Sequence, residues 1–216
     1  SSFEPQNMGK AINTDRPEYF PSITADDSMF LFTRRVLDEN APWGNEQEDI
    51  YVSTKQFGHW SDGALISENI NSFYNEGAPT FSADGKYVIF VGCETGNKGD
   101  YEYGGDRKGY GSCDLFASEK VGDTWSKPFN LGPPINSKHW ETQPSFSSDG
   151  KTLAIGVPNS GGLSSYLHTT IGAARIYRNN NDSWEQIGSD IYGEAGSPNF
   201  GTSVSLSSDG SRVVIA

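Results

Sequence analysis

A strand, a tight turn and a returning strand are predicted by the stretch Phe81-Ser82-Ala83-Asp84-Gly85-Lys86-Tyr87-Val88-Ile89-Phe90. Glycine adopts the positive φ that closes such a turn without a steric penalty, and the aspartate before it can hydrogen-bond to nearby backbone groups. The same unit recurs along the chain, with its turn aspartates at Asp26, Asp84, Asp149 and Asp209. A hairpin that returns about every 60 residues indicates a repeat architecture.

The composition favours an all-β protein. The chain has 216 residues, of which 34% are hydrophobic and 12% aromatic, with 25 glycines and 11 prolines. Short strands joined by glycine-rich turns, with aromatic side chains packed between sheets, fit this profile. We find no long stretch with apolar residues at helical spacing, which argues against a helical fold.

The charge argues against nucleic acid as a partner. The formal net charge is −12, with only 16 lysines and arginines, so the surface repels phosphate backbones. The longest apolar run, near residues 87–91, has the length of a strand and is too short to span a membrane. The sequence starts at Ser1 without a basic and apolar leader, which indicates either a removed signal segment or an excised fragment.

Each unit continues beyond its hairpin in the same order. A loop leads to a third strand, predicted at residues 49–53, 113–118 and 174–178. A tryptophan follows each of these strands, at Trp60, Trp125 and Trp184. A fourth short strand and a connector come next, at residues 70–72, 135–137 and 191–193. Small four-stranded antiparallel sheets cannot bury their own faces, so they predict radial packing in a β-propeller.

The boundaries predict a single propeller domain over residues 1–216 with an incomplete ring. Three complete blades are expected at about residues 14–68, 72–133 and 137–192. A partial fourth blade is expected from residues 199–216 together with residues 1–12, because the N-terminal segment matches the outer strand at residues 125–137. Such an N-terminal strand commonly closes a propeller. The missing third strand indicates either a longer parent propeller or closure of the ring by a second copy.

Residues 3–153 resemble the TolB-type, WD40-like propeller repeats found in envelope proteins of Bacteroidota, often ahead of OmpA-like domains. The residues that carry this resemblance are Pro21-Ser22-Ile23-Thr24-Ala25-Asp26, Asp49-Ile50-Tyr51-Val52-Ser53, Gly111-Ser112-Cys113-Asp114-Leu115-Phe116 and the segment 125–136. The resemblance implies a scaffold in the periplasm or at the outer membrane, with no catalytic residues to transfer.

Residues 154–216 are similar to FG-GAP-like propeller repeats of the integrin-α type. The similarity lies in residues 154–158, 174–178, 184–188 and 203–210, and lysine is absent after Lys151. Some blades of that family hold calcium in an aspartate-rich loop. The matching stretch here, Asn179-Asn180-Asn181-Asp182, has a single carboxylate, so we predict no metal site.

Cys93 and Cys113 are predicted to form a disulfide. They stand at the end of a second strand and at the start of the third strand of the same blade, where antiparallel neighbours reach bonding distance. A disulfide fits an extracytoplasmic location. The alternative is a pair of buried free thiols.

Glu18, Glu76 and Glu141 occupy equivalent positions, each three residues before a proline. Paired carboxylates suggest glycosidase chemistry. One carboxylate per repeat at a fixed position is better explained by structure, for instance a hydrogen bond to the backbone where the strand begins.

Two long loops, at residues 36–48 and 94–112, are the best candidates for binding. Aromatic and arginine side chains on exposed loops dominate protein interfaces, whereas the alternative is that these side chains only cover the blade edges. The candidate binding residues are Arg34, Arg35, Trp43, Tyr101, Tyr103, Arg107 and Tyr110.

These observations predict a non-enzymatic β-propeller that acts as a protein-interaction scaffold of the bacterial cell envelope, without cofactor or metal. The expected partners are envelope proteins. Two alternatives stay open at this point: a carbohydrate-binding or carbohydrate-active propeller, and a hybrid or engineered fragment with no ligand of its own.

Overall fold

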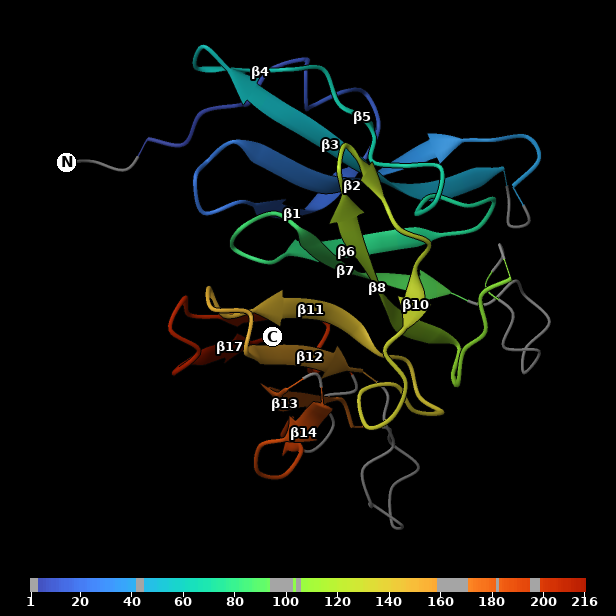
Figure 1. Cartoon of the computed structure of the whole chain (residues 1–216). Helices are drawn as coiled ribbons and strands as arrows, with labels where there is room; N and C mark the ends of the chain where they lie inside the picture. The colour runs from blue at the N-terminus through green and yellow to red at the C-terminus, as the bar shows by residue number, and fades with distance from the viewer. Residues whose placement is uncertain are drawn as a thin grey trace.

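The computed structural model describes residues 4–41, 45–93, 103, 106–158, 171–181, 183–194 and 199–216. These residues form four antiparallel sheets and no helix, and the sheets follow one another in chain order (Figure 1). None of the described segments is a helix of the length and apolarity that crossing a membrane requires. The all-β prediction is confirmed.

The first three sheets share one plan: the first three strands pair in chain order as antiparallel neighbours, and the two short strands that follow both pair with the third. The first sheet comprises β1 (Glu18–Ile23), β2 (Met29–Leu37), β3 (Glu46–Gln56), β4 (His59–Trp60) and β5 (Ala64–Leu65). The second comprises β6 (Glu76–Phe81), β7 (Tyr87–Cys93), β8 (Cys113–Val121), β9 (Thr124–Trp125) and β10 (Phe129–Asn130). The third comprises β11 (Thr142–Phe146), β12 (Thr152–Val157), β13 (Ala173–Asn180), β14 (Ser183–Gln186) and β15 (Ile191–Tyr192). The fourth has two strands, β16 (Val204–Leu206) and β17 (Val213–Ile215).

The recurring turn forms as the sequence predicts, through a glycine with a positive φ and an aspartate that accepts nearby hydrogen bonds. Gly85 has a φ of 67°, and one carboxylate oxygen of Asp84 accepts hydrogen bonds from Ser82 Oγ at 2.7 Å and Lys86 N at 3.1 Å. Asp149 and Asp209 make the same pair of bonds in their own turns. These hydrogen bonds hold the pKa of Asp84 below its usual value.

The first strand of each complete sheet contains a bulge just after its glutamate. Phe20, Ala78 and Gln143 have φ values of 54°, 48° and 49°, and the strand pairing shifts register at each of them. A positive φ is uncommon for residues other than glycine and reflects local strain. The same irregularity in three sheets is therefore part of the repeat.

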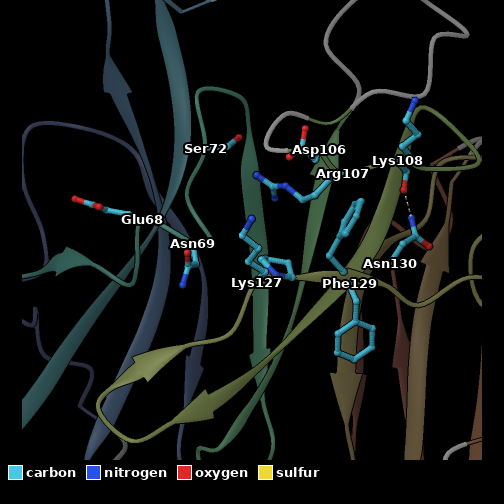
Figure 2. A pocket seen from close by; sticks show the side chains of 11 residues that line it. Glu68, Asn69, Ser72, Asp106, Arg107, Lys108, Lys127, Phe129 and Asn130 are labelled. Atoms are coloured by element: carbon cyan, nitrogen blue, oxygen red, sulfur yellow. Dashed lines mark hydrogen bonds between the residues drawn. The ribbon is translucent and has the colours of Figure 1, made fainter.

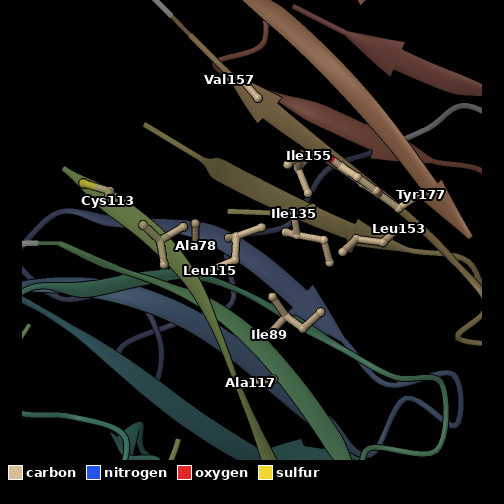
Figure 3. Packing of buried hydrophobic residues seen from close by; sticks show 11 residues of the cluster. Ala78, Ile89, Cys113, Leu115, Ala117, Ile135, Leu153, Ile155, Val157 and Tyr177 are labelled. Atoms are coloured by element: carbon tan, nitrogen blue, oxygen red, sulfur yellow. The ribbon is translucent and has the colours of Figure 1, made fainter. Parts of the chain in front are cut away.

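Neighbouring sheets pack against one another through apolar cores, arranged around a common axis. The first strands β1, β6, β11 and β16 contact one another in turn, as radial packing requires. Leu31, Ile50, Phe90 and Phe116 belong to the core between sheets one and two. The core between sheets two and three includes Ile89, Leu115, Leu153, Ile155 and Tyr177 (Figure 3). A smaller core with Ala154, Ala174 and Val204 joins sheets three and four.

The prediction that the N-terminal segment closes the last blade is wrong. Residues 4–17 contain no strand and contact the first sheet, where Ala11 O accepts a hydrogen bond from Gly63 N at 2.9 Å. Arg34 Nη2 donates to Ile12 O at 2.9 Å, and the Ile12 side chain is buried. Among the described residues the fourth sheet has two strands and no third, outer-facing strand for this segment to pair with, and the carbonyls of Ala11 and Ile12 are bonded at the first sheet.

The predicted fourth strands at residues 70–72 and 135–137 are turns, and the fourth strands lie earlier in the chain. Asn71 explains the difference, because its side chain bonds Ile50 N and Ile50 O at 2.9 Å, in the way a neighbouring strand would. Asn136 makes the same two bonds with Leu115. The third prediction, at Ile191 and Tyr192, coincides with β15.

The predicted disulfide is present. Cys93 and Cys113 are bonded to each other and lie opposite one another in the pairing of β7 and β8. The bridge ties the two ends of the long loop between these strands together.

Candidate functional site

A cavity of about 470 Å³ opens at the edge of the second sheet (Figure 2). Its lining comes from the connector before β6, from the loop before β8 and from the region around β10. Three positively charged side chains line it, Arg107, Lys108 and Lys127, together with the carboxylates of Glu68 and Asp106. We call this cavity the Arg107 pocket. Cationic side chains are in excess here although the whole chain carries a net charge of −12.

Arg107 lines the pocket and is held in place by a buried ion pair. Arg107 Nη2 donates to Glu76 Oε1 at 2.8 Å, and both side chains are almost completely buried. Ser72 also binds this carboxylate, through its backbone N at 2.8 Å and its hydroxyl at 2.5 Å. In Figure 2 the Arg107 side chain points toward Ser72. The carboxylate therefore holds the start of β6 and the arginine together.

The same carboxylate arrangement recurs in the other complete sheets. Thr14 donates its backbone N and its hydroxyl to Glu18, and Ser137 does the same to Glu141. The structural interpretation of the three glutamates, a bond to backbone at the strand entry, is confirmed. Each glutamate accepts from a serine or threonine four residues earlier, and this spacing is visible in the sequence.

Each glutamate also lies beside an arginine, but the three arginines come from different places. Arg34 on β2 reaches Glu18 at 2.9 Å, and Arg107 comes from the loop before β8. Arg175 on β13 lies 3.7 Å from Glu141 and forms a closer pair with Asp190 at 3.0 Å. Buried carboxylates need compensating charge, and each sheet supplies it from a different position.

Burial perturbs the titration of these groups. Burial raises the pKa of Glu76 to about 7, against the opposing effect of Arg107 and Ser72. Burial also raises the pKa of Glu141 to about 7, and the pKa of Asp49 to about 6. Raised carboxyl pKa values often mark active sites, but here each glutamate also makes the hydrogen bonds that begin a strand.

Glu141 should make the stability of the chain depend on pH. Its folded pKa of about 7 lies above the ordinary value of 4.5, so between these values the folded state holds a proton that the unfolded state has lost. The free energy of unfolding should therefore fall as pH rises through this window, by at most about 1.4 kcal/mol per pH unit from this one group. Urea unfolding from pH 5 to 8 should show a flatter profile for Glu141→Gln. The control is Glu46→Gln at an exposed position, and parallel profiles for Glu141→Gln and the wild type would contradict the assignment.

Two of the predicted binding residues, Arg34 and Arg35, lie on the first sheet and form ion pairs within it. Arg34 pairs with Glu18 and lies over the Tyr51 ring, with its guanidinium carbon 4.5 Å from the ring centroid. Arg35 is partly exposed and pairs with Glu48 at 3.0 Å. Both arginines bind partners within their own sheet, and neither lines the Arg107 pocket.

The expected exposure of the second loop needs correction for two residues. Tyr103 is 1% exposed and belongs to the core between sheets one and two, where its hydroxyl donates to Gly111 O. Arg107 is 7% exposed because it reaches inward to Glu76. Tyr110 is exposed, and its backbone N donates to Asp114 at 2.8 Å. Trp43 and Tyr101 lie outside the described residues.

Sequence reasoning missed Lys127, Asn69 and Phe129, which also line the pocket. They lie outside the two long loops, in the segments that follow the third strands β3 and β8. The described residues contain no group of three or more histidine, cysteine, aspartate or glutamate side chains placed to hold a metal ion.

No family model and no curated protein sequence matches this chain. Solved structures do match it. TolB from Acinetobacter baumannii superposes with a TM-score of 0.53 at 14% identity, over 95% of this chain and 39% of that protein. A TolB-type protein from Agrobacterium tumefaciens gives 0.53 at 14% identity, over 94% and 59%. The chain is an incomplete β-propeller.

The tricorn protease also matches, with a TM-score of 0.52 at 11% identity over 90% of this chain and 20% of that protein. Identities this low show the fold alone. The chain spans 39% and 59% of the two TolB structures, so the activities and partners of whole proteins do not transfer to it.

Proposed function

We propose that this chain is a non-enzymatic propeller domain that binds a partner protein of the bacterial cell envelope at the Arg107 pocket. The observation that carries the proposal is the charge of that pocket. Three cationic side chains line this cavity against two carboxylates, in a chain with a net charge of −12, and the exposed Lys108 and Lys127 can pair with aspartate and glutamate side chains of a partner segment.

Other observations support a binding role. The buried pair with Glu76 fixes the Arg107 side chain that lines the pocket, and a preorganised side chain lowers the entropy lost on binding. The disulfide fits a periplasmic or outer-membrane-associated location. The hydrogen bonds that Glu18, Glu76 and Glu141 make at the strand starts weaken the carbohydrate-active alternative, because a glycosidase needs carboxylates that face substrate.

Charge reversal in the pocket tests the proposal. The immobilised chain is compared with Lys108→Glu/Lys127→Glu for recovery of proteins from a bacterial periplasmic extract, and each recovered protein is then purified for direct binding. We expect a salt-sensitive partner that the double variant no longer binds. A matched control is Lys10→Glu/Lys138→Glu, which reverses two exposed charges outside the pocket.

Equal binding by the wild type and the pocket variant would overturn the proposed site. Hydrolysis of a polysaccharide or a peptide above background would overturn the non-enzymatic assignment. Closure of the ring by a second copy stays a prediction, which the molar mass in solution tests.

A further inference from the structure

A second groove lies between sheets two and three and is lined by four aromatic rings. Its members are Tyr87 on β7, Phe129 on β10, Phe146 on β11 and Trp184 on β14. We call it the aromatic groove. We propose that the aromatic groove binds an extended, proline-containing peptide that carries lysine or arginine. This site is separate from the Arg107 pocket, although Phe129 lies between the two.

The groove is long because two adjoining cavities form it. One has a volume of about 500 Å³ and holds the four rings, and the other, of about 600 Å³, reaches the hairpin turns at Asp84 and Asp149. Ser82, Tyr87, Glu119 and Gly150 line both cavities, so the two cavities adjoin. An extended chain can contact both the four rings and the hairpin turns, whereas a compact small molecule would occupy one cavity.

The rings form a connected series along the groove. The Tyr87 ring centroid lies 6.4 Å from that of Phe129 and 6.1 Å from that of Phe146. Phe146 in turn lies 6.3 Å from Trp184. These distances allow ring-to-ring contact while leaving ring surface toward the cavity.

The equivalent position between sheets one and two shows that packing alone does not require this groove. There Phe81 and Trp125 stack at 6.2 Å and are only 6% and 5% exposed. By strand register Met29 takes the place of Tyr87, and this flexible side chain packs against the closed core. Between sheets two and three the corresponding rings, Phe146 and Trp184, are half-buried and line a cavity, and Phe129 on β10 adds a ring that is 47% exposed.

The chemistry of the groove selects the peptide. Proline-rich segments bind aromatic-lined grooves because their polyproline II conformation is already extended and loses little entropy. The polar end of the groove carries more negative than positive side chains. Three carboxylates and two ammonium groups line it, from Asp84, Glu119 and Asp149 and from Lys86 and Lys120. With the net charge of −12, this balance favours a positively charged ligand, whose cation can also interact with the ring faces.

Fluorescence anisotropy with a short labelled peptide of proline pairs separated by lysines tests the proposal. We expect saturable binding that weakens with salt and that falls at least about tenfold in Trp184→Ala. Glu119→Lys, at an exposed position, should also weaken binding and reduce its salt dependence. Because Trp184→Ala removes a partly buried ring, its folding is checked by thermal unfolding, and Glu119→Lys provides the second readout.

Two controls separate this site from other surfaces. Phe57→Asn removes a fully exposed ring outside the groove and should leave peptide binding unchanged. Lys108→Glu/Lys127→Glu disrupts the Arg107 pocket and should also leave it unchanged, so the two proposals fail independently. The groove proposal is overturned if the peptide does not bind, or if folded Trp184→Ala and Glu119→Lys bind it as the wild type does. It is equally overturned if a neutral oligosaccharide, cellohexaose, binds in a Trp184-dependent manner and the peptide does not.

Discussion

Replacing Arg107 with alanine is expected to lower the free energy of unfolding by about 3–5 kcal/mol, a large effect for one side chain. The guanidinium is buried 2.8 Å from Glu76, so its removal leaves a buried carboxylate without its compensating charge. Urea denaturation near pH 8 measures the effect. The loss should shrink at pH 5, because Glu76 can then take up a proton.

Two further variants make this result specific. Arg35→Ala removes a partly exposed pair with Glu48 and should cost less than about 1 kcal/mol. The double variant Glu76→Gln/Arg107→Met should recover much of the stability lost in Arg107→Ala, because it removes both charges together. If Arg107→Ala cost no more than Arg35→Ala, the buried pair would have no stabilising role.

Phe116→Ala is expected to cost about 3–5 kcal/mol through loss of apolar burial and the cavity it leaves. The Phe116 ring is 1% exposed, and its centroid lies 6.1 Å from that of Phe90 and 5.3 Å from that of Tyr103. It therefore connects the second sheet to the core shared with the first.

The matched control for Phe116 is Phe57→Ala, because Phe57 is fully exposed. This change should alter the free energy of unfolding by no more than about 0.5 kcal/mol. Comparable losses in the two variants would show that the core between the first two sheets does not determine stability.

The repeat could be predicted because its causes are local. The turn at Asp84 and Gly85 depends on one carboxylate and one positive φ, both set by neighbouring residues. The disulfide followed from strand order, since Cys93 and Cys113 end and begin paired strands. The fourth strands predicted at residues 70–72 and 135–137 are absent because a side chain takes the place of a neighbouring strand, as Asn71 does beside Ile50.

The candidate site could be predicted only in part. The aromatic and arginine residues of the long loop before β8 predict a binding surface, and the Arg107 pocket includes part of this loop. Composition does not say which of those side chains turn inward, and Tyr103 and Arg107 are buried. The lysine and asparagine that complete the pocket, Lys127 and Asn69, come from other segments.

The amino-acid order alone determines the hairpins, the three complete sheets and the glutamate that begins each of them, because these depend on contacts within a few residues or between adjacent strands. Only the tertiary structure decides which arginine neutralises each glutamate and where the N-terminal segment lies. It also decides that aromatic rings pack closed between sheets one and two but line a groove between sheets two and three. Those outcomes depend on charge burial and on side-chain volumes that meet across sheets. Segments distant in the chain set both quantities, so no local pattern records them.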